Sequence, residues 1–150
     1  MTSIRSRAPR ASSAAIRRVM QANVGRETVP EQTVRQFLYR AGLRYRKDQR
    51  PIPCLHCAAD LVFPKAKLCI FIDGCFWHGC PIHFRAPASN RAWWVEKIEA
   101  NRARDLRNDQ LLNEAGWQVV RLWEHELSDQ RLTQLVIIIR RRLGIRTKNS

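Results

Sequence analysis

The sequence predicts a single α/β domain in which a small mixed β-sheet is flanked by helices. Its length of 150 residues is typical of one domain, and a hydrophobic content of 45% is enough to fill a core. Hydrophobic periodicity gives the order helix, three strands, helix, strand, helix. A tight turn joins two of the consecutive strands, which are therefore expected to be antiparallel. The strand after the second helix is expected to be parallel to a neighbour, and the sheet is therefore mixed.

The net charge indicates a polyanionic partner. The chain has 27 Lys and Arg residues against 13 Asp and Glu, a formal charge of +14. Cations that neutralise phosphates release counterions, so nucleic acid is the favoured partner and a membrane surface is the competing interpretation. The longest apolar run, residues 135–139, is far shorter than the ~20 residues of a spanning helix. We therefore expect no membrane association.

Both ends of the chain are predicted to be basic extensions. Residues 1–13 are rich in Arg, lack acidic residues and are expected to form a disordered arm. They also lack the apolar core of a secretory signal. Residues 14–22 have helical spacing. The functional domain is expected to span residues 14–143, and residues 144–150 form a basic tail.

Pro30 and Glu31 mark the first turn of a helix that begins at residue 28 or 29. A proline there needs no backbone donor, and an acidic side chain suits the positive end of the helix dipole. The helix is expected to reach Arg40 or Ala41 and to end at Gly42. Its buried side chains are predicted to be Val34, Phe37 and Leu38.

Three strands are expected next. Residues 43–47 alternate apolar and basic side chains, as a half-buried strand does. Residues 58–63 form the second strand, and a turn over residues 64–67 leads to the third, residues 68–72. The third strand is wholly apolar, which predicts that both of its faces are covered.

A long charged helix is predicted over residues 91–114, with Ser89 or Asn90 as its cap and Gly116 beyond its end. Its inward residues are expected to be Trp94, Ile98, Leu111 and Leu112. Residues 117–123 form the parallel strand, and Ser128 begins a last helix. Its inward residues are expected to be Leu132, Leu135, Ile138 and Ile139.

Residues 73–83 concentrate metal-binding chemistry. Cys75, Cys80 and His83 could supply three zinc ligands, because thiolate and imidazole are the ligands that zinc prefers. A fourth protein ligand makes such a site structural, which leaves His78 free to be a general acid or base. The candidates for the fourth ligand are His125, Cys57, Cys54, His56 and Cys69, although Cys69 lies in an apolar strand and is expected to be a packing residue.

Asp60 is a carboxylate among strand hydrophobics. Such a group is costly to bury without a partner, and a metal ion is one such partner. The competing interpretation places Asp60 on the solvent face of an edge strand. The predicted hairpin brings Asp60 near His78, which favours a functional role.

Several segments together carry a family resemblance. In order along the chain they are residues 28–31 (TVPE), 71–81 (FIDGCFWHGCP), 93–98 (WWVEKI), 101–105 (NRARD), 116–119 (GWQV) and 123–124 (WE). They closely resemble the very-short-patch repair (Vsr) endonuclease family, whose members nick DNA beside a thymine mispaired with guanine. The resemblance implies a PD-(D/E)XK nuclease-like fold, an enzyme acting on double-stranded DNA, and cofactors Mg²⁺ and Zn²⁺.

The resemblance also implies catalytic roles. Asp60 matches the metal-binding carboxylate, and the residue ending the next strand, Ile72, would add a backbone carbonyl to the same Mg²⁺. His78 matches the catalytic histidine, and Asp105 is its expected orienting or water-organising carboxylate. Glu31 matches an active-site acid on the first family helix.

Two further residue groups follow from the resemblance. The structural zinc positions are matched by Cys75, Cys80, His83 and His125. The aromatics that wedge into the base stack are matched by Phe76, Trp77 and Trp94. Basic residues of the long helix are expected to hold the DNA backbone, namely Lys97, Arg102, Arg104 and Arg107.

The chain departs from the family pattern at three places. Residues 53–60 contain Cys54 and Cys57 before the catalytic Asp, where the family has Pro-Gly-x-Pro-Asp or similar, and this pair could hold a second metal. Ile72 stands where the repair enzymes have Thr, and the following Asp73 could serve as an extra metal carboxylate or as a turn residue. The zinc loop reads Cys-Pro-x-His rather than a histidine-rich run.

Three functions are carried forward. The first is nicking beside a T·G mismatch, and the second is a restriction-like or structure-directed endonuclease on the same scaffold. The third is a zinc-stabilised DNA-binding module without catalysis. We expect a monomer in the cytoplasm, associated with the nucleoid through DNA, with mismatch-repair or methyltransferase proteins as possible partners. The odd number of cysteines, five, agrees with a reducing compartment.

Overall fold

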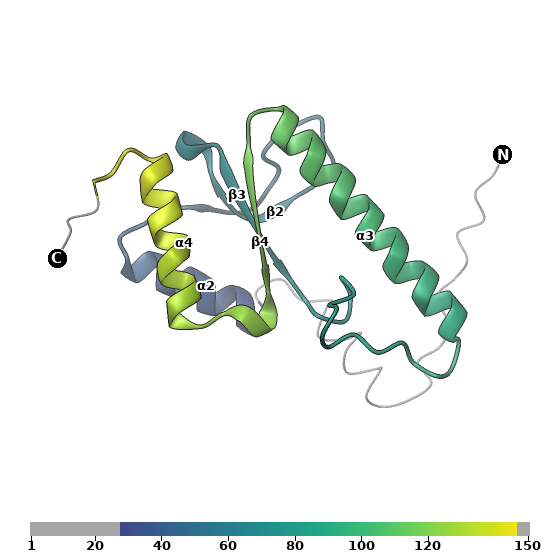
Figure 1. Ribbon diagram of the computed structural model, residues 1–150. Helices are drawn as coiled ribbons and strands as arrows, with labels where there is room; N and C mark the ends of the chain where they lie inside the picture. The colour runs from purple at the N-terminus through teal and green to yellow at the C-terminus, as the bar shows by residue number, and fades with distance from the viewer. Residues whose placement is uncertain (1–27, 147–150) are drawn as a thin grey trace.

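The computed structural model describes residues 28–146, which form a small α/β domain (Figure 1). The predictions for residues 1–13, for the helix over 14–22 and for the end of the tail lie outside the described residues. Within residues 28–146 there are three α-helices and one four-stranded sheet. The helices are α2 (Val29–Arg40), α3 (Arg91–Glu114) and α4 (Asp129–Arg142). The strands are β1 (Arg46–Gln49), β2 (Ala59–Phe63), β3 (Leu68–Asp73) and β4 (Gln118–Trp123).

The sheet is mixed, as predicted. Its strand order is β1-β2-β3-β4; β2 is antiparallel to both β1 and β3, and β4 is parallel to β3. A 3₁₀ turn over Pro64–Ala66, followed by Lys67 in the left-handed conformation, closes the β2–β3 hairpin. Ile72 pairs with Leu122, and Asp73 pairs with Trp123. The segments that leave β3 and β4 therefore emerge side by side at one edge of the sheet.

Helices cover both faces of the sheet: α2 and α4 lie on one side and α3 on the other (Figure 1). In β3, Leu68 and Ile70 belong to the core formed with α2 and α4, whereas Cys69 and Phe71 belong to the smaller core that includes Leu112 of α3. This alternation explains the wholly apolar sequence of the strand. Cys69 is fully buried, which confirms its prediction as a packing residue.

Helix α2 agrees with its prediction. Val34 and Leu38 are fully buried, and Phe37 packs against the same core. Gly42 follows the helix with φ +82°, a conformation that glycine adopts without strain.

The predicted position of the first strand is wrong. Strand β1 covers Arg46–Gln49 rather than residues 43–47, and all four of its residues are exposed. Leu43 is 3% exposed, but its amide bonds to the Leu38 carbonyl at the end of α2, so its backbone closes the helix instead of entering the sheet. Tyr45 also packs on the core before the strand begins.

Helix α3 has the predicted bounds, with two corrections. Leu111 is 43% exposed, because the buried positions Trp94, Ile98 and Leu112 define a face on which residue 111 does not lie. Asn90 occupies the cap position but makes no capping bond: its backbone is left-handed, with φ +58°, and its amide donates to Ser89 Oγ instead.

The last two elements agree with prediction. Strand β4 is parallel to β3, and Ser128 Oγ accepts a hydrogen bond from the Arg131 amide at the start of α4. The inward face of α4 buries Leu132, Leu135 and Ile139, with Ile138 partly buried. Among the described residues, no helix combines the length and apolar character needed to cross a membrane.

Candidate active site and metal cluster

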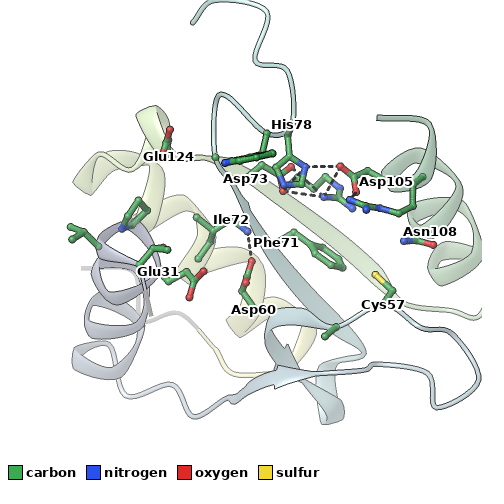
Figure 2. A pocket seen from close by; sticks show the side chains of 18 of the residues that line it. Glu31, Cys57, Asp60, Phe71, Ile72, Asp73, His78, Asp105, Asn108 and Glu124 are labelled. Atoms are coloured by element: carbon green, nitrogen blue, oxygen red, sulfur yellow. Dashed lines mark hydrogen bonds and ion pairs between the residues drawn. The ribbon is translucent and has the colours of Figure 1, made fainter. Parts of the chain in front are cut away.

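A cavity of about 860 Å³ opens beside the carboxyl end of β3 (Figure 2). Its walls come from the start of α2, the segment before β2, strands β2, β3 and β4, the loop after β3, and α3. All five residues predicted for catalysis or magnesium binding line it: Glu31, Asp60, Ile72, His78 and Asp105. The fold therefore brings together side chains that are up to 74 positions apart, from Glu31 to Asp105.

Asp60 lies at the floor of this cavity. The Ile72 amide donates a 2.7 Å hydrogen bond to its Oδ2 atom. The pKa of Asp60 is raised to about 6: burial raises it most, the Ile72 hydrogen bond partly offsets this, and the charges of Glu31, Asp48 and Asp73 add to the rise. A carboxylate held in this way favours a bound cation, which would compensate its buried charge.

Two further carboxylates accompany Asp60. Ligand atoms of Glu31, Asp48 and Asp60 lie within 4.8 Å of one another. Asp48 was missed in the sequence because it follows a basic stretch and resembles a solvent-facing residue. The Arg35 side chain is 7% exposed, and its guanidinium lies 3.5 Å from the Glu31 carboxylate and 3.6 Å from that of Asp48. Three converging oxygen donors of this kind fit Mg²⁺, which takes carboxylate and carbonyl oxygens together with water.

His78 and Asp105 form a close pair on the opposite wall. His78 Nδ1 lies 2.6 Å from Asp105 Oδ2 and 3.6 Å from Asp73 Oδ1. Burial raises the pKa of Asp105, but the hydrogen bond and charge of His78 and the charge of Arg121 outweigh it, so the net shift is downward. With Nδ1 committed to Asp105, the second ring nitrogen, Nε2, is the one available for chemistry.

Arg121 on β4 was missed in the sequence. Its Nε and NH2 groups donate to Asp109 at 2.6–3.0 Å, and NH1 donates to both oxygens of Asp73 at 3.1 and 3.2 Å. Its guanidinium lies 4.3 Å from the centre of the Phe71 ring. Asp73 is 5% exposed and is the last residue of β3 rather than a turn residue, and its carboxylate is engaged by Arg121.

The Cys–His residues predicted to hold zinc lie together. Ligand atoms of Cys75, Cys80, His83 and His125 are all within 4.8 Å of one another. The sulfur-to-Nδ1 distances are 3.2–3.9 Å. Bond lengths of a tetrahedral zinc site imply about 3.5 Å between such atoms. The donor set and its spacing therefore fit a structural zinc ion.

The electrostatics of the cluster also favour a cation. Burial, the Glu124 carboxylate and Cys80 raise the pKa of the Cys75 thiol to about 12. Glu124 also accepts a 2.9 Å hydrogen bond from the Cys75 amide. Of the candidates for the fourth ligand, His125 is the one at the cluster. Within residues 28–146, no group of three or more metal-ligating side chains includes Cys54 or Cys57.

Helix α3 supports the loop that carries His78. The buried Asn101 side chain donates to the Trp77 carbonyl at 3.0 Å, and Arg102 donates to the Gly79 carbonyl. Gly79 has φ +64°, and a Cβ atom there would lie 2.5 Å from Ile98 Cγ2. Only glycine fits this close approach between loop and helix.

The three aromatic residues predicted to form the wedge differ in exposure. Phe76 and Trp77 are partly exposed, and their rings are 5.3 Å apart. Trp94 is 2% exposed and packs against both rings, at 5.3 and 5.9 Å, so it supports them rather than reaching the surface. The buried Trp77 Nε1 has no hydrogen-bond acceptor within the described part of the chain.

The basic residues of α3 that are expected to hold the DNA backbone are all exposed. They are Lys97, Arg102, Arg104 and Arg107.

Comparison with known proteins agrees with this site. The family model described as "DNA mismatch endonuclease Vsr" matches residues 11–83. A "Type II nicking enzyme V.NaeI" of Lentzea aerocolonigenes is 46% identical, over 73% of this chain and 67% of its own. A "Type II nicking enzyme V.XorIIP" of Xanthomonas oryzae pv. oryzae is 43% identical, over 75% of this chain and 82% of its own.

The "DNA mismatch endonuclease Vsr" of Escherichia coli (strain K12) is 34% identical, over 77% of this chain and 76% of its own. The similarity therefore extends over about two thirds or more of both chains, and the family model covers Glu31, Asp60 and His78 of the cavity. The chain belongs to the Vsr family of DNA endonucleases.

Proposed function

We propose that this protein nicks one strand of double-stranded DNA beside a T·G mismatch, by Mg²⁺-dependent hydrolysis of a phosphodiester on a PD-(D/E)XK-type scaffold. The observation that carries the proposal is that one cavity is lined both by Asp60 and by the His78–Asp105 pair. A DNA-binding module without catalysis requires neither the buried carboxylate nor a histidine oriented by an acid.

The carboxylate group of Glu31, Asp48 and Asp60 is the proposed holder of Mg²⁺, with the Ile72 carbonyl as a further oxygen. When bound there, the ion supplies positive charge to the scissile phosphate and the departing oxygen. The Cys–His cluster is the proposed site of a structural Zn²⁺ that holds the loop of residues 75–83.

The side chains supply the proton transfer. His78 Nε2 accepts a proton from the attacking water as the water oxygen forms its bond to phosphorus. The bond from phosphorus to the leaving oxygen then breaks, and the departing oxygen takes a proton from a solvent water to become a hydroxyl. Asp105 holds the Nδ1–H tautomer through its 2.6 Å hydrogen bond and stabilises the positive charge that develops on the ring.

Phe76 and Trp77 are the proposed mismatch probe. Both rings are partly exposed and rest on buried Trp94, so they form a supported apolar projection next to the cavity. Apolar side chains unstack DNA at the lowest cost where base pairing is already weak. This difference in cost would select a mismatched step over a paired one.

Cleavage assays on three DNA substrates test the proposal. Supercoiled or end-labelled DNA carrying a T·G pair, the corresponding T·A duplex and a branched duplex would be incubated with the enzyme and Mg²⁺. We expect one-strand cleavage of the T·G duplex, lost in Asp60→Asn. Equal nicking of the T·A duplex would support a restriction-like role instead, in line with relatives named as type II nicking enzymes. Salt-sensitive binding without cleavage of any duplex would contradict an enzymatic function.

A further inference from the structure

Arg121 and His78 share the same two carboxylate oxygens. Asp73 Oδ1 lies 3.1 Å from Arg121 NH1 and 3.6 Å from His78 Nδ1. Asp105 Oδ2 lies 4.0 Å from Arg121 NH1 and 2.6 Å from His78 Nδ1. Arg121 NH1, Asp73 Oδ1, His78 Nδ1 and Asp105 Oδ2 therefore form a closed ring of four contacts. Because both carboxylates contact the guanidinium as well as the imidazole, a shift of the guanidinium is expected to move both of them.

The guanidinium itself is fixed from three directions. Asp109 accepts from Nε and NH2, Asp73 accepts from NH1, and the Phe71 ring covers one face at 4.3 Å. A bidentate bond to a carboxylate sets the plane of an arginine as well as its position. The side chain, 20% exposed, is therefore held rigidly between α3, β3 and the cavity.

Such a network is a poor way to gain stability alone. Desolvating the charges costs about as much as their pairing returns, and apolar residues of similar volume are often equally stable. An arginine and three carboxylates beside a cavity histidine are better explained by a need for orientation.

We propose that Arg121 is a positioning residue of the nuclease: it holds Asp73 and Asp105 so that His78 keeps its Nδ1 bound and its Nε2 directed to the scissile phosphate. This inference rests on the proposed function. Arg121 touches no reacting atom. It acts through the two carboxylates, and Asp109 acts through Arg121 from outside the cavity wall.

Single-turnover nicking and DNA affinity, measured separately, test the assignment. With enzyme in excess over T·G duplex and Mg²⁺ present, Arg121→Gln should lower the nicking rate on the order of 100-fold, because small displacements of a catalytic group have effects of that size. The dissociation constant for the same duplex without Mg²⁺ should change less than about twofold, since Arg121 contributes no DNA contact in this assignment. Arg141→Gln, an exposed arginine on α4, is the matched control and should leave both unchanged.

Asp109→Asn by itself keeps the test decisive if Arg121→Gln folds poorly, and a double-mutant cycle extends the test if both variants fold. The hydrogen bonds of the Asp109 side chain in the described structure go to Arg121. Asp109→Asn should therefore slow nicking, and Arg121→Gln with Asp109→Asn should be no slower than Arg121→Gln alone. A wild-type rate in Asp109→Asn, or additive losses in the double variant, would overturn the proposal.

A spectroscopic measurement separates failure of this inference from failure of the proposed function. In ¹⁵N-histidine-labelled protein, the ring N–H of His78, assigned with His78→Gln, should give a downfield signal that disappears in Arg121→Gln. If wild type nicks nothing yet the signal disappears, the proposed function fails and the positioning role stands. If wild type nicks and the variant keeps both rate and signal, the positioning role is wrong.

Discussion

His78 Nδ1 and Asp105 Oδ2, 2.6 Å apart, join the loop after β3 to the middle of α3. The contact spans 27 positions in the sequence and crosses the rim of the cavity. An imidazole held by one nitrogen presents the other in a fixed direction, which is the arrangement that general-base catalysis requires.

Asp105→Asn should slow nicking of a T·G duplex on the order of 100-fold, and His78→Gln should slow it at least as much, as is typical when general acid–base catalysis is lost. An amide favours the wrong histidine tautomer, whereas removal of the imidazole eliminates the base. Single-turnover rates measure both effects. Asp129→Asn, an exposed acid at the start of α4, is the control. Full activity of Asp105→Asn would contradict the orienting role.

Asp60 predicts an unusual dependence of stability on pH. Its folded-state pKa of about 6 is above the unfolded value of 3.8, so the folded state binds the proton more tightly. This contribution to stability is fully present below pH ~4 and is lost as the pH rises through ~6. Without added divalent cation, Asp60→Asn should be more stable than wild type at pH 7, by up to ~2 kcal/mol, and the difference should vanish near pH 4.

Urea unfolding of both proteins across this pH range measures the effect. Added Mg²⁺ should stabilise wild type at pH 7 but not Asp60→Asn, because ligand binding to the native state alone raises its stability. A wild type that gains no stability from Mg²⁺ would contradict a metal-binding role for Asp60.

Cys80→Ser should remove the structural metal. A serine hydroxyl is a poor zinc ligand, and the remaining residues would leave buried Cys75 without its cation. Elemental analysis should find about one zinc per chain in wild type and little in the variant, with a lower unfolding temperature. Cys54→Ser, at an exposed cysteine outside the cluster, is the matched control and should retain zinc. Equal zinc content in the two variants would rule out the assigned ligand set.

Gly79→Ala should destabilise the protein more than Gly42→Ala. Both glycines have positive φ, +64° and +82°, so both substitutions introduce backbone strain of about 1 kcal/mol. A Cβ at residue 42 meets nothing within 4 Å, whereas one at residue 79 meets Ile98 Cγ2 at 2.5 Å. This overlap should add about 1–3 kcal/mol to the loss at residue 79, measured by urea unfolding. Equal losses of unfolding free energy in the two variants would contradict a close packing of Gly79 against Ile98 of α3.

Trp77→Ala should reduce discrimination between T·G and T·A duplexes. A partly exposed ring that stacks at a distorted step contributes about 1–3 kcal/mol, so affinity for the T·G duplex should fall at least about fivefold. Affinity for the T·A duplex should change little, because the probe does not enter paired DNA. Fluorescence anisotropy with both duplexes measures the ratio, and an equal loss on both would argue for ordinary packing.

The sequence predicted those parts of the fold in which local pattern and tertiary packing agree. Helix α3 combines helix-forming residues with Gly116 beyond its end, and its bounds matched. Strand β1 was misplaced because Leu43 and Tyr45 are apolar for contact with the core, while the sheet pairing begins only at Arg46. Leu111 was placed inward because a hydrophobic residue at the edge of a helix face carries no signal of its own exposure.

The residues of the candidate site that were predicted are those that match family motifs. Glu31, Asp60, His78 and Asp105 line one cavity as expected. Arg121 and Asp48 were missed, because an arginine in an alternating strand and an aspartate in a polar stretch both resemble solvent-facing residues. Their roles depend on partners that are 12 or more positions away in the sequence.

The turn between Cys75 and Cys80 couples several features of the site in one short segment. The Cys80 amide bonds to the Cys75 carbonyl at 2.8 Å, the two sulfur atoms meet the same pair of histidines, and His78 lies between them. An insertion inside this turn would therefore displace His78, the rings of Phe76 and Trp77, and the clustered Cys and His side chains at once.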